Sequence, residues 1–106
     1  MKNGIYALFF ETDGNSFGHG ILVVEDGLAN GADSTYTYNG KFEESRLILG
    51  LNRYNFSVNS YFGNLGFIKV NLNFQEDDLG YVLTGNIENL QTIPLKVQAK
   101  FIGDIV

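Results

Sequence analysis

Few residues in this 106-residue chain could do acid–base or metal chemistry. His19 is the single histidine, and it lies between Gly18 and Gly20 at the start of an apolar run, with no acid, nucleophile or second ligand beside it in the sequence. A catalytic histidine needs a group to activate, so the favoured interpretation is a histidine without a catalytic role. The Gly-His-Gly segment also lacks the third glycine and the following helix of a dinucleotide-binding loop.

Two runs of carboxylates remain as candidates. Glu76-Asp77-Asp78 lacks the alternate spacing and the distal glutamate of a calcium loop, which favours a solvated turn. Glu43-Glu44 has the same simple interpretation, but two carboxylates on a hairpin could also select a basic partner, because surface charges steer association. The chain has no cysteine, which excludes disulfides, thiolate nucleophiles and thiolate metal sites. We therefore expect no enzyme activity, no metal and no cofactor.

Charge and length narrow the class of protein. Seven Lys or Arg against twelve Asp or Glu give a net charge of −5, and the basic residues are scattered, so direct binding to DNA or RNA is not expected. The apolar run at residues 5–10 is shorter than the hydrophobic region of a signal peptide, and no segment approaches the ~20 apolar residues of a spanning helix. We expect a single domain over residues 1–106, cytoplasmic and without membrane insertion.

The elements that must position these residues are all strands. In most of the expected strands apolar and polar residues alternate, and Gly, Asn and Asp lie between the strands. Asp26-Gly27 offers two consecutive positions that tolerate positive φ, as a type I′ hairpin turn requires. Pro94 is expected at the head of the last strand, where its missing N–H costs least. The expected strands cover residues 5–11, 17–25, 28–31, 34–42, 46–52, 67–74, 81–87 and 94–101.

Eight sequential strands with no crossover helix indicate an antiparallel meander. Closing the meander into an up-and-down β-barrel removes its edges, while a two-sheet sandwich is the rival arrangement. The longest connection, residues 57–66, could hold a short helical turn. A barrel of this size is either filled by side chains or leaves room for one small ligand. The candidate lining of such a cavity is Phe10, Tyr36, Tyr38, Leu49, Leu51, Val70, Leu72 and Leu83.

The first strand is apolar on both faces, and the alternation does not decide which face is inside. One face belongs to the core, and a subunit interface is the simplest role for the other. We take Ile5, Ala7 and Phe9 as the candidate interface of a homodimer.

Several motifs resemble the negative regulators of enterobacterial type III secretion, the GrlR-type repressors. The match covers most of the chain and weakens after Tyr54. It rests on Lys2-Asn3-Gly4-Ile5-Tyr6, Phe17-Gly18-His19-Gly20-Ile21-Leu22-Val23, Gly31-Ala32-Asp33-Ser34, Tyr36-x-Tyr38-x-Gly40 and Asn52-Arg53-Tyr54-Asn55.

The resemblance implies a lipocalin-like barrel, a homodimer, and a repressor that binds a helix-turn-helix transcriptional activator rather than DNA. It also implies a cavity that accepts a lipid-like molecule. A family repressor uses four acidic residues at the positions of Glu43, Glu44, Ser45 and Arg46, and only the first two are acidic here. The function expected first is therefore a non-enzymatic negative regulator of transcription of a secretion- or virulence-type locus, which binds an activator through Glu43 and Glu44. The alternative is a carrier or sensor of a small apolar, lipid-like ligand.

Overall fold

The structure is a computed structural model that describes residues 1–60, 62–63, 65–88 and 90–106, with the backbone alone for residues 90–92. Every regular element in this part of the chain is a β-strand. The strands are β1 (Gly4–Thr12), β2 (Asn15–Glu25), β3 (Leu28–Ala32), β4 (Tyr36–Glu43), β5 (Arg46–Arg53), β6 (Phe67–Glu76), β7 (Gly80–Ile87) and β8 (Leu90–Gly103).

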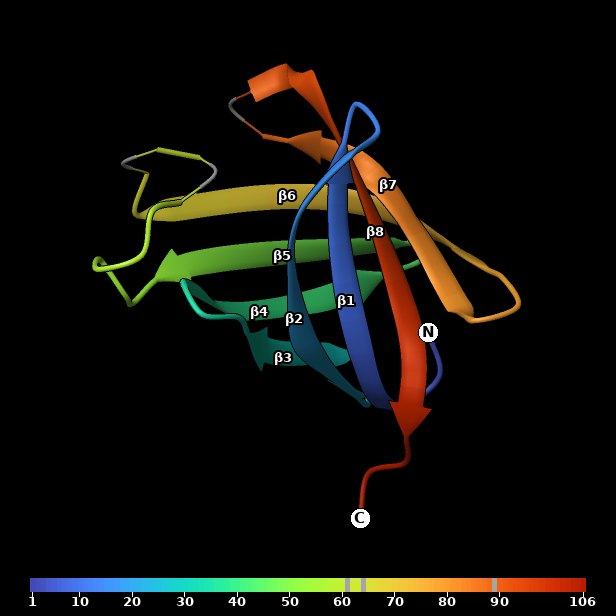
Figure 1. Ribbon diagram of the computed structural model, residues 1–106. Coiled ribbons are helices and arrows are strands. Elements are labelled where there is room, and N and C mark those ends of the chain that lie inside the picture. The colour runs from blue at the N-terminus through green and yellow to red at the C-terminus, as the bar shows by residue number, and fades with distance from the viewer. Residues whose placement is uncertain (61, 64, 89) are drawn as a thin grey trace.

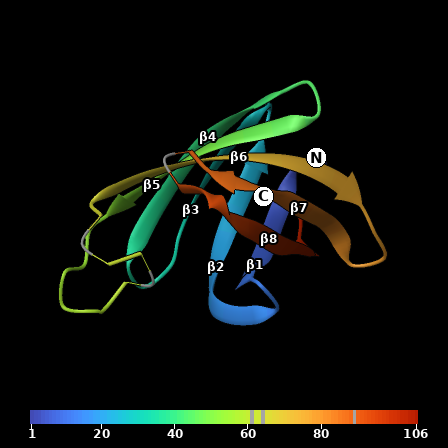
Figure 2. The ribbon, with the colours of Figure 1, turned by 90° about the horizontal axis from the view of Figure 1, so that it is seen from above.

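Each strand pairs antiparallel with the next one along the chain, and β8 pairs with β1 to close the barrel. Figure 1 shows β1 and β8 passing in front of β4, β5 and β6 and crossing them steeply, and Figure 2 gives the view of the barrel from above. The predicted eight-stranded up-and-down barrel, of the kind found in lipocalins, is confirmed, and the rival two-sheet sandwich is wrong.

Tight turns set the pairing register. Asp26 and Gly27 have φ values of 52° and 82°, which confirms two left-handed positions in the β2–β3 turn. Asp13 and Gly14, at 49° and 79°, repeat this geometry between β1 and β2. The predicted gap between the first two strands, residues 12–16, is therefore too wide, because Thr12 pairs with Asn15 inside the hairpin.

The last strand differs most from the prediction. β8 begins at Leu90, so Pro94 lies inside the strand and not at its head. The register between β7 and β8 shifts at Asn86/Ile87, and β1 pairs with β8 only as far as Lys96. Proline is tolerated at this position because it lies beside a bulge and beyond the β1 ladder. In the β5–β6 connection the described residues form turns and no helix, and residues 61 and 64 lie outside the described part.

The two ends of the barrel differ. The terminal end holds both chain termini and the β2–β3, β4–β5 and β6–β7 turns, and the loop end holds the other four connections, including the long one between β5 and β6 (Figure 1). Edge-to-face aromatic contacts fill the interior toward the terminal end, with ring centroids 5.5 to 6.1 Å apart. These rings form a chain in the order Phe42, Phe74, Tyr81, Tyr6 and Phe101.

The faces of the first strand are now assigned. Tyr6, Leu8 and Phe10 are buried inside the barrel, while Ile5 and Ala7 are half-buried on the outside and Phe9 is 48% exposed there. The described residues form no helix long and apolar enough to cross a membrane.

Candidate functional site

The barrel interior is not filled at the loop end, where a cavity of about 240 Å³ remains. Its wall includes the exposed residues Gly18, Ser34 and Asn59, so the cavity reaches the surface at this end. Six of the eight residues expected to line a cavity do line it: Phe10, Tyr36, Leu49, Leu51, Val70 and Leu72. Tyr38 and Leu83 are buried in the core but are not part of the wall.

Aliphatic side chains from three strands form the floor of the cavity. Leu49 of β5 pairs with Val70 of β6, and Leu51 and Leu72 stand on the same inward faces. Leu95 adds to this floor from β8. Every second residue of β5 and β6 is apolar over this stretch and points inward, which is the strand periodicity visible in the sequence.

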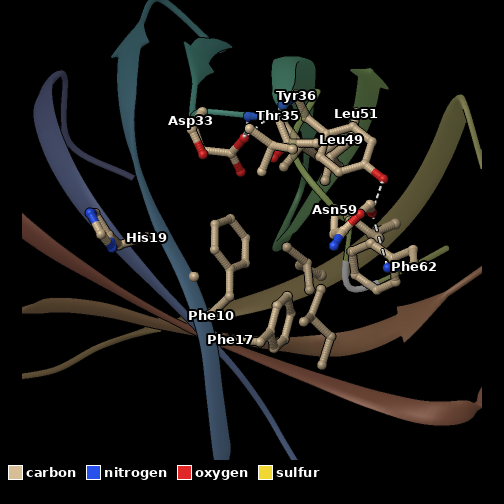
Figure 3. Close-up of a pocket in the computed structure, with 17 residues that line it drawn as sticks. Phe10, Phe17, His19, Asp33, Thr35, Tyr36, Leu49, Leu51, Asn59 and Phe62 are labelled. Carbon is tan, nitrogen blue, oxygen red and sulfur yellow. Dashed lines mark hydrogen bonds between the residues drawn. The ribbon is translucent and has the colours of Figure 1, made fainter. Parts of the chain in front are cut away.

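Above the floor, four aromatic side chains form an aromatic collar, which we define as Phe10, Phe17, Phe62 and Tyr36. Their centroids are 5.8 Å apart for Phe10–Phe17, 5.6 Å for Phe17–Phe62 and 6.4 Å for Tyr36–Phe62. Figure 3 shows the labelled rings around one space, contributed by β1, β2, β4 and the β5–β6 connection. The cavity therefore offers a ligand both aromatic rings and aliphatic carbon.

Phe17 enters the collar because of a β-bulge. Phe10 pairs with Gly18 and the next residue of β1, Glu11, pairs with Ser16, so the register between β1 and β2 shifts by one residue at Phe17. A bulge of this kind re-aims a side chain, and here it turns Phe17 toward the interior. Strand periodicity alone could not find Phe17, since it is out of phase with the inward residues farther along β2.

Phe62 is positioned by the polar contacts of its own connection. The Arg53 guanidinium donates to the carbonyl oxygens of Val58, at 2.9 Å, and Gly63, at 3.0 Å, and so holds the connection from both sides. Ser60 Oγ is hydrogen-bonded to the Tyr36 hydroxyl and accepts from the Phe62 N–H at 3.0 Å. These bonds tie the connection to the barrel wall and place Phe62 over the cavity.

Asp33 organises the β3–β4 turn on the opposite side of the opening. Its Oδ1 accepts the backbone N–H groups of Thr35 at 2.7 Å and Tyr36 at 2.6 Å, and its Oδ2 accepts the Tyr38 hydroxyl. Burial, and next the hydrogen bond to Asp33, raise the pKa of Tyr38 well above its ordinary value, so the hydroxyl stays a donor. Gly20 makes room for it, since a Cβ there would lie 2.6 Å from the Tyr38 hydroxyl oxygen. The Asp33 carboxylate thus accepts hydrogen bonds that stabilise the β3–β4 turn.

His19 contributes to the wall but not by its ring. The residue is exposed and pairs with Phe9 on the outside of the barrel, and its imidazole points away from the cavity in Figure 3. Among the described residues, no group of three His, Cys, Asp or Glu side chains lies close enough to hold a metal ion.

Glu43 and Glu44 lie at the terminal end, on the β4–β5 turn. Both are exposed, Glu44 has a positive φ of 55°, and Lys41 Nζ lies 3.3 Å from Glu43 Oε1. Backbone hydrogen bonds join this turn to its neighbours, from Phe42 to Gly27 and from Phe74 to Ser45. The β2–β3, β4–β5 and β6–β7 hairpins thus bring seven of the twelve acidic residues to this end: Glu25, Asp26, Glu43, Glu44, Glu76, Asp77 and Asp78.

The outer face of β1 and β2 is apolar beyond the three residues expected there. Val23 is opposite Ile5, and Ile21 is opposite Ala7. Ile21 is 44% exposed, close to the value for Phe9. We call Ile5, Ala7, Phe9, Ile21 and Val23 the outer apolar face.

Comparison with known proteins adds no family to this geometry, because neither the protein-family models nor the curated proteins searched match the chain.

Proposed function

We propose that this chain is a non-enzymatic binding barrel that takes a small apolar ligand into its cavity and works as a carrier or sensor. The observation that carries this proposal is the cavity of about 240 Å³ with its aliphatic floor and aromatic collar. Ligand sites in proteins combine apolar walls with a few polar groups at the opening, and this wall has that composition. Each apolar group that moves from water into such a wall gains free energy.

The titratable groups of the wall support a binding role over catalysis. The imidazole of His19 points outward, and the carboxylate of Asp33 accepts three hydrogen bonds from the protein itself. Neither group is placed to exchange a proton with a molecule inside the cavity, which general acid–base catalysis requires.

Native mass spectrometry of protein purified from its own source tests the proposal. We expect a bound mass that is absent after denaturation, and we expect 1-octanol to bind to protein refolded without lipid. A bare mass of 11.8 kDa in the first measurement and no octanol binding in the second would together refute it.

We propose as a second function a negative regulator of transcription of a secretion- or virulence-type locus, acting in the cytoplasm by binding a transcriptional activator. It is supported by the resemblance of the sequence to GrlR-type repressors and by the acidic turns around Glu43 and Glu44. These carboxylates are exposed and gathered at one end, which suits attraction to a basic protein and opposes contact with nucleic acid.

A pull-down from host lysate with a matched pair of variants tests this second function. Glu43→Lys/Glu44→Lys should lose the activator, while Glu76→Lys/Asp78→Lys, with the same change in charge on the next turn, should retain it. Equal recovery of the activator by wild type and by the first variant would show that Glu43 and Glu44 do not bind it.

We also propose that two copies associate through the outer apolar face. Its residues come from neighbouring strands and form one surface on the outside of the barrel, and burying such a surface against a second copy would be favourable.

A further inference from the structure

We propose that the cavity selects its ligand by charge and size, taking an uncharged amphiphile of about eight to ten non-hydrogen atoms and rejecting the carboxylate of the same length. This inference rests on the proposed ligand-binding function and names the class of ligand.

The volume sets the size. At about 30 Å³ for each water-sized group, a cavity of 240 Å³ holds about eight non-hydrogen atoms, with the polar head at the opening. Cavities for drug-sized ligands measure about 300–1,000 Å³, so this one lies below that range. The aromatic chain around Phe74 and Tyr81 occupies the interior toward the terminal end, so a longer tail would have to displace these rings. A chain of sixteen carbons would leave about half of its length in water.

The charges of the wall set the head group. Among the described residues that line the cavity there is no Lys or Arg, and residues 61, 64 and 89–92 include none in the sequence. The guanidinium of Arg53 is bound to two carbonyl oxygens of the β5–β6 connection, and the imidazole of His19 points away. In the described part of the wall, the charged group at the opening is therefore the carboxylate of Asp33.

An anionic head would lose its hydration beside Asp33 without meeting a cation, and burying a charge without a partner is costly. An uncharged head avoids that cost. Ser34, Thr35 and Asn59 bring hydroxyl and amide groups to the wall, and these can donate to or accept from an alcohol or a carbonyl. The wall therefore fits an alcohol, ester or amide better than an acid.

Binding of 1-octanol, methyl octanoate and sodium octanoate, measured by calorimetry or ligand-observed NMR at neutral pH, tests the charge selection. We expect the alcohol and the ester to bind and the octanoate to bind at least about tenfold more weakly. Equal binding of all three would overturn the charge selection and leave the ligand-binding function standing. Binding of none of them would overturn the ligand-binding function itself.

A gain-of-function variant separates charge from shape. Asn59 is exposed at the opening, and Asn59→Lys should raise the affinity for octanoate relative to that for octanol by about tenfold. The control is Ser57→Lys, an exposed residue of the same connection outside the wall, which should change neither affinity. If both lysines raise octanoate affinity equally, the effect is a general attraction and the assigned position of the head group is wrong.

A series of alcohols tests the size limit. Affinity should rise by about fourfold for each added methylene up to about ten non-hydrogen atoms and then level off. A constant increment as far as hexadecanol would show that the barrel has more room than the cavity at the loop end, and would overturn the size limit.

Discussion

Replacing Val70 by phenylalanine tests whether the cavity is empty space that a side chain can occupy. Val70 is buried at 1% exposure and lines the floor on β6. The substitution adds four carbon atoms, which at about 30 Å³ each fill about half of the 240 Å³. Burying these carbons gains up to about 3 kcal/mol, at about 0.8 kcal/mol for each, and this offsets the cost of about 1–3 kcal/mol that overpacking brings. We expect a free energy of unfolding within about 1 kcal/mol of wild type.

The matched control is Val24→Phe, since Val24 is equally buried at 1% exposure but lies outside the wall of the cavity. Without space to enter, the larger ring should lower the free energy of unfolding by about 1–3 kcal/mol. Urea unfolding at a constant m-value measures both variants, and octanol binding should be lost in Val70→Phe alone. If the two substitutions destabilise the barrel equally, the cavity is filled in solution and the reasoning fails.

Three further predictions address the connection, the tyrosines and the outer face. Arg53→Met removes both hydrogen bonds to the β5–β6 connection, so stability in urea should fall by about 1–3 kcal/mol and octanol should dissociate faster by NMR exchange; unchanged dissociation would mean that the connection does not cover the ligand. Burial raises the pKa of Tyr38 and raises that of Tyr6 to about 12. The free energy of unfolding should therefore stay constant up to pH about 10 and then fall by about 1.4 kcal/mol per pH unit for each tyrosine. In Tyr38→Phe this fall should be shallower. Ile21→Asp should convert a dimer to a monomer in sedimentation at micromolar concentration while Ile48→Asp, on the outside of β5, does not; a wild-type monomer would contradict the proposed interface.

Much of the barrel follows from local sequence rules. Asp26-Gly27 predicts a two-residue turn because both residues tolerate positive φ, and the register on either side follows from that turn. The same rule applies at Asp13-Gly14, but the strands there extend farther than expected. Asn15 and Ser16 have turn propensity, and the pairing across the hairpin overrides it.

The cavity follows from the sequence only in part. Period-two alternation places Leu49, Val70 and Leu72 inside the barrel, but whether an inward residue borders empty space depends on the side chains that arrive from other strands. For this reason Leu83 points inward but is packed against other side chains and does not border the cavity. Tyr38 does not border the cavity either, because its hydroxyl is hydrogen-bonded to Asp33. These outcomes depend on contacts between residues distant in sequence, which no local pattern contains.

Two residues of the aromatic collar could not be predicted from strand alternation. Phe17 faces inward because a bulge shifts its phase, and Phe62 faces inward because Arg53 and Ser60 hold a segment outside any strand. A sequence pattern that counts alternation sees neither event. Bulges are common next to tight hairpin turns, so the position of Phe17 shortly after the Asp13-Gly14 turn is a weak sequence signal that its side chain points inward.

The positions of the two candidate sites separate the two proposed functions physically. The cavity opens at the loop end, whereas Glu43 and Glu44 lie at the terminal end, and the packed chain of aromatic rings around Tyr6, Phe74 and Tyr81 lies between them. Distant sites without shared partners usually act independently, so loss of one function should leave the other intact. A sensor that passes ligand occupancy to the acidic turns would have to transmit it through the buried side chains between the two ends, and this aromatic chain is part of them. Ligand-dependent capture of an activator would therefore require a rearrangement of packed interior side chains, whereas a carrier and a partner-binding surface that act separately require none.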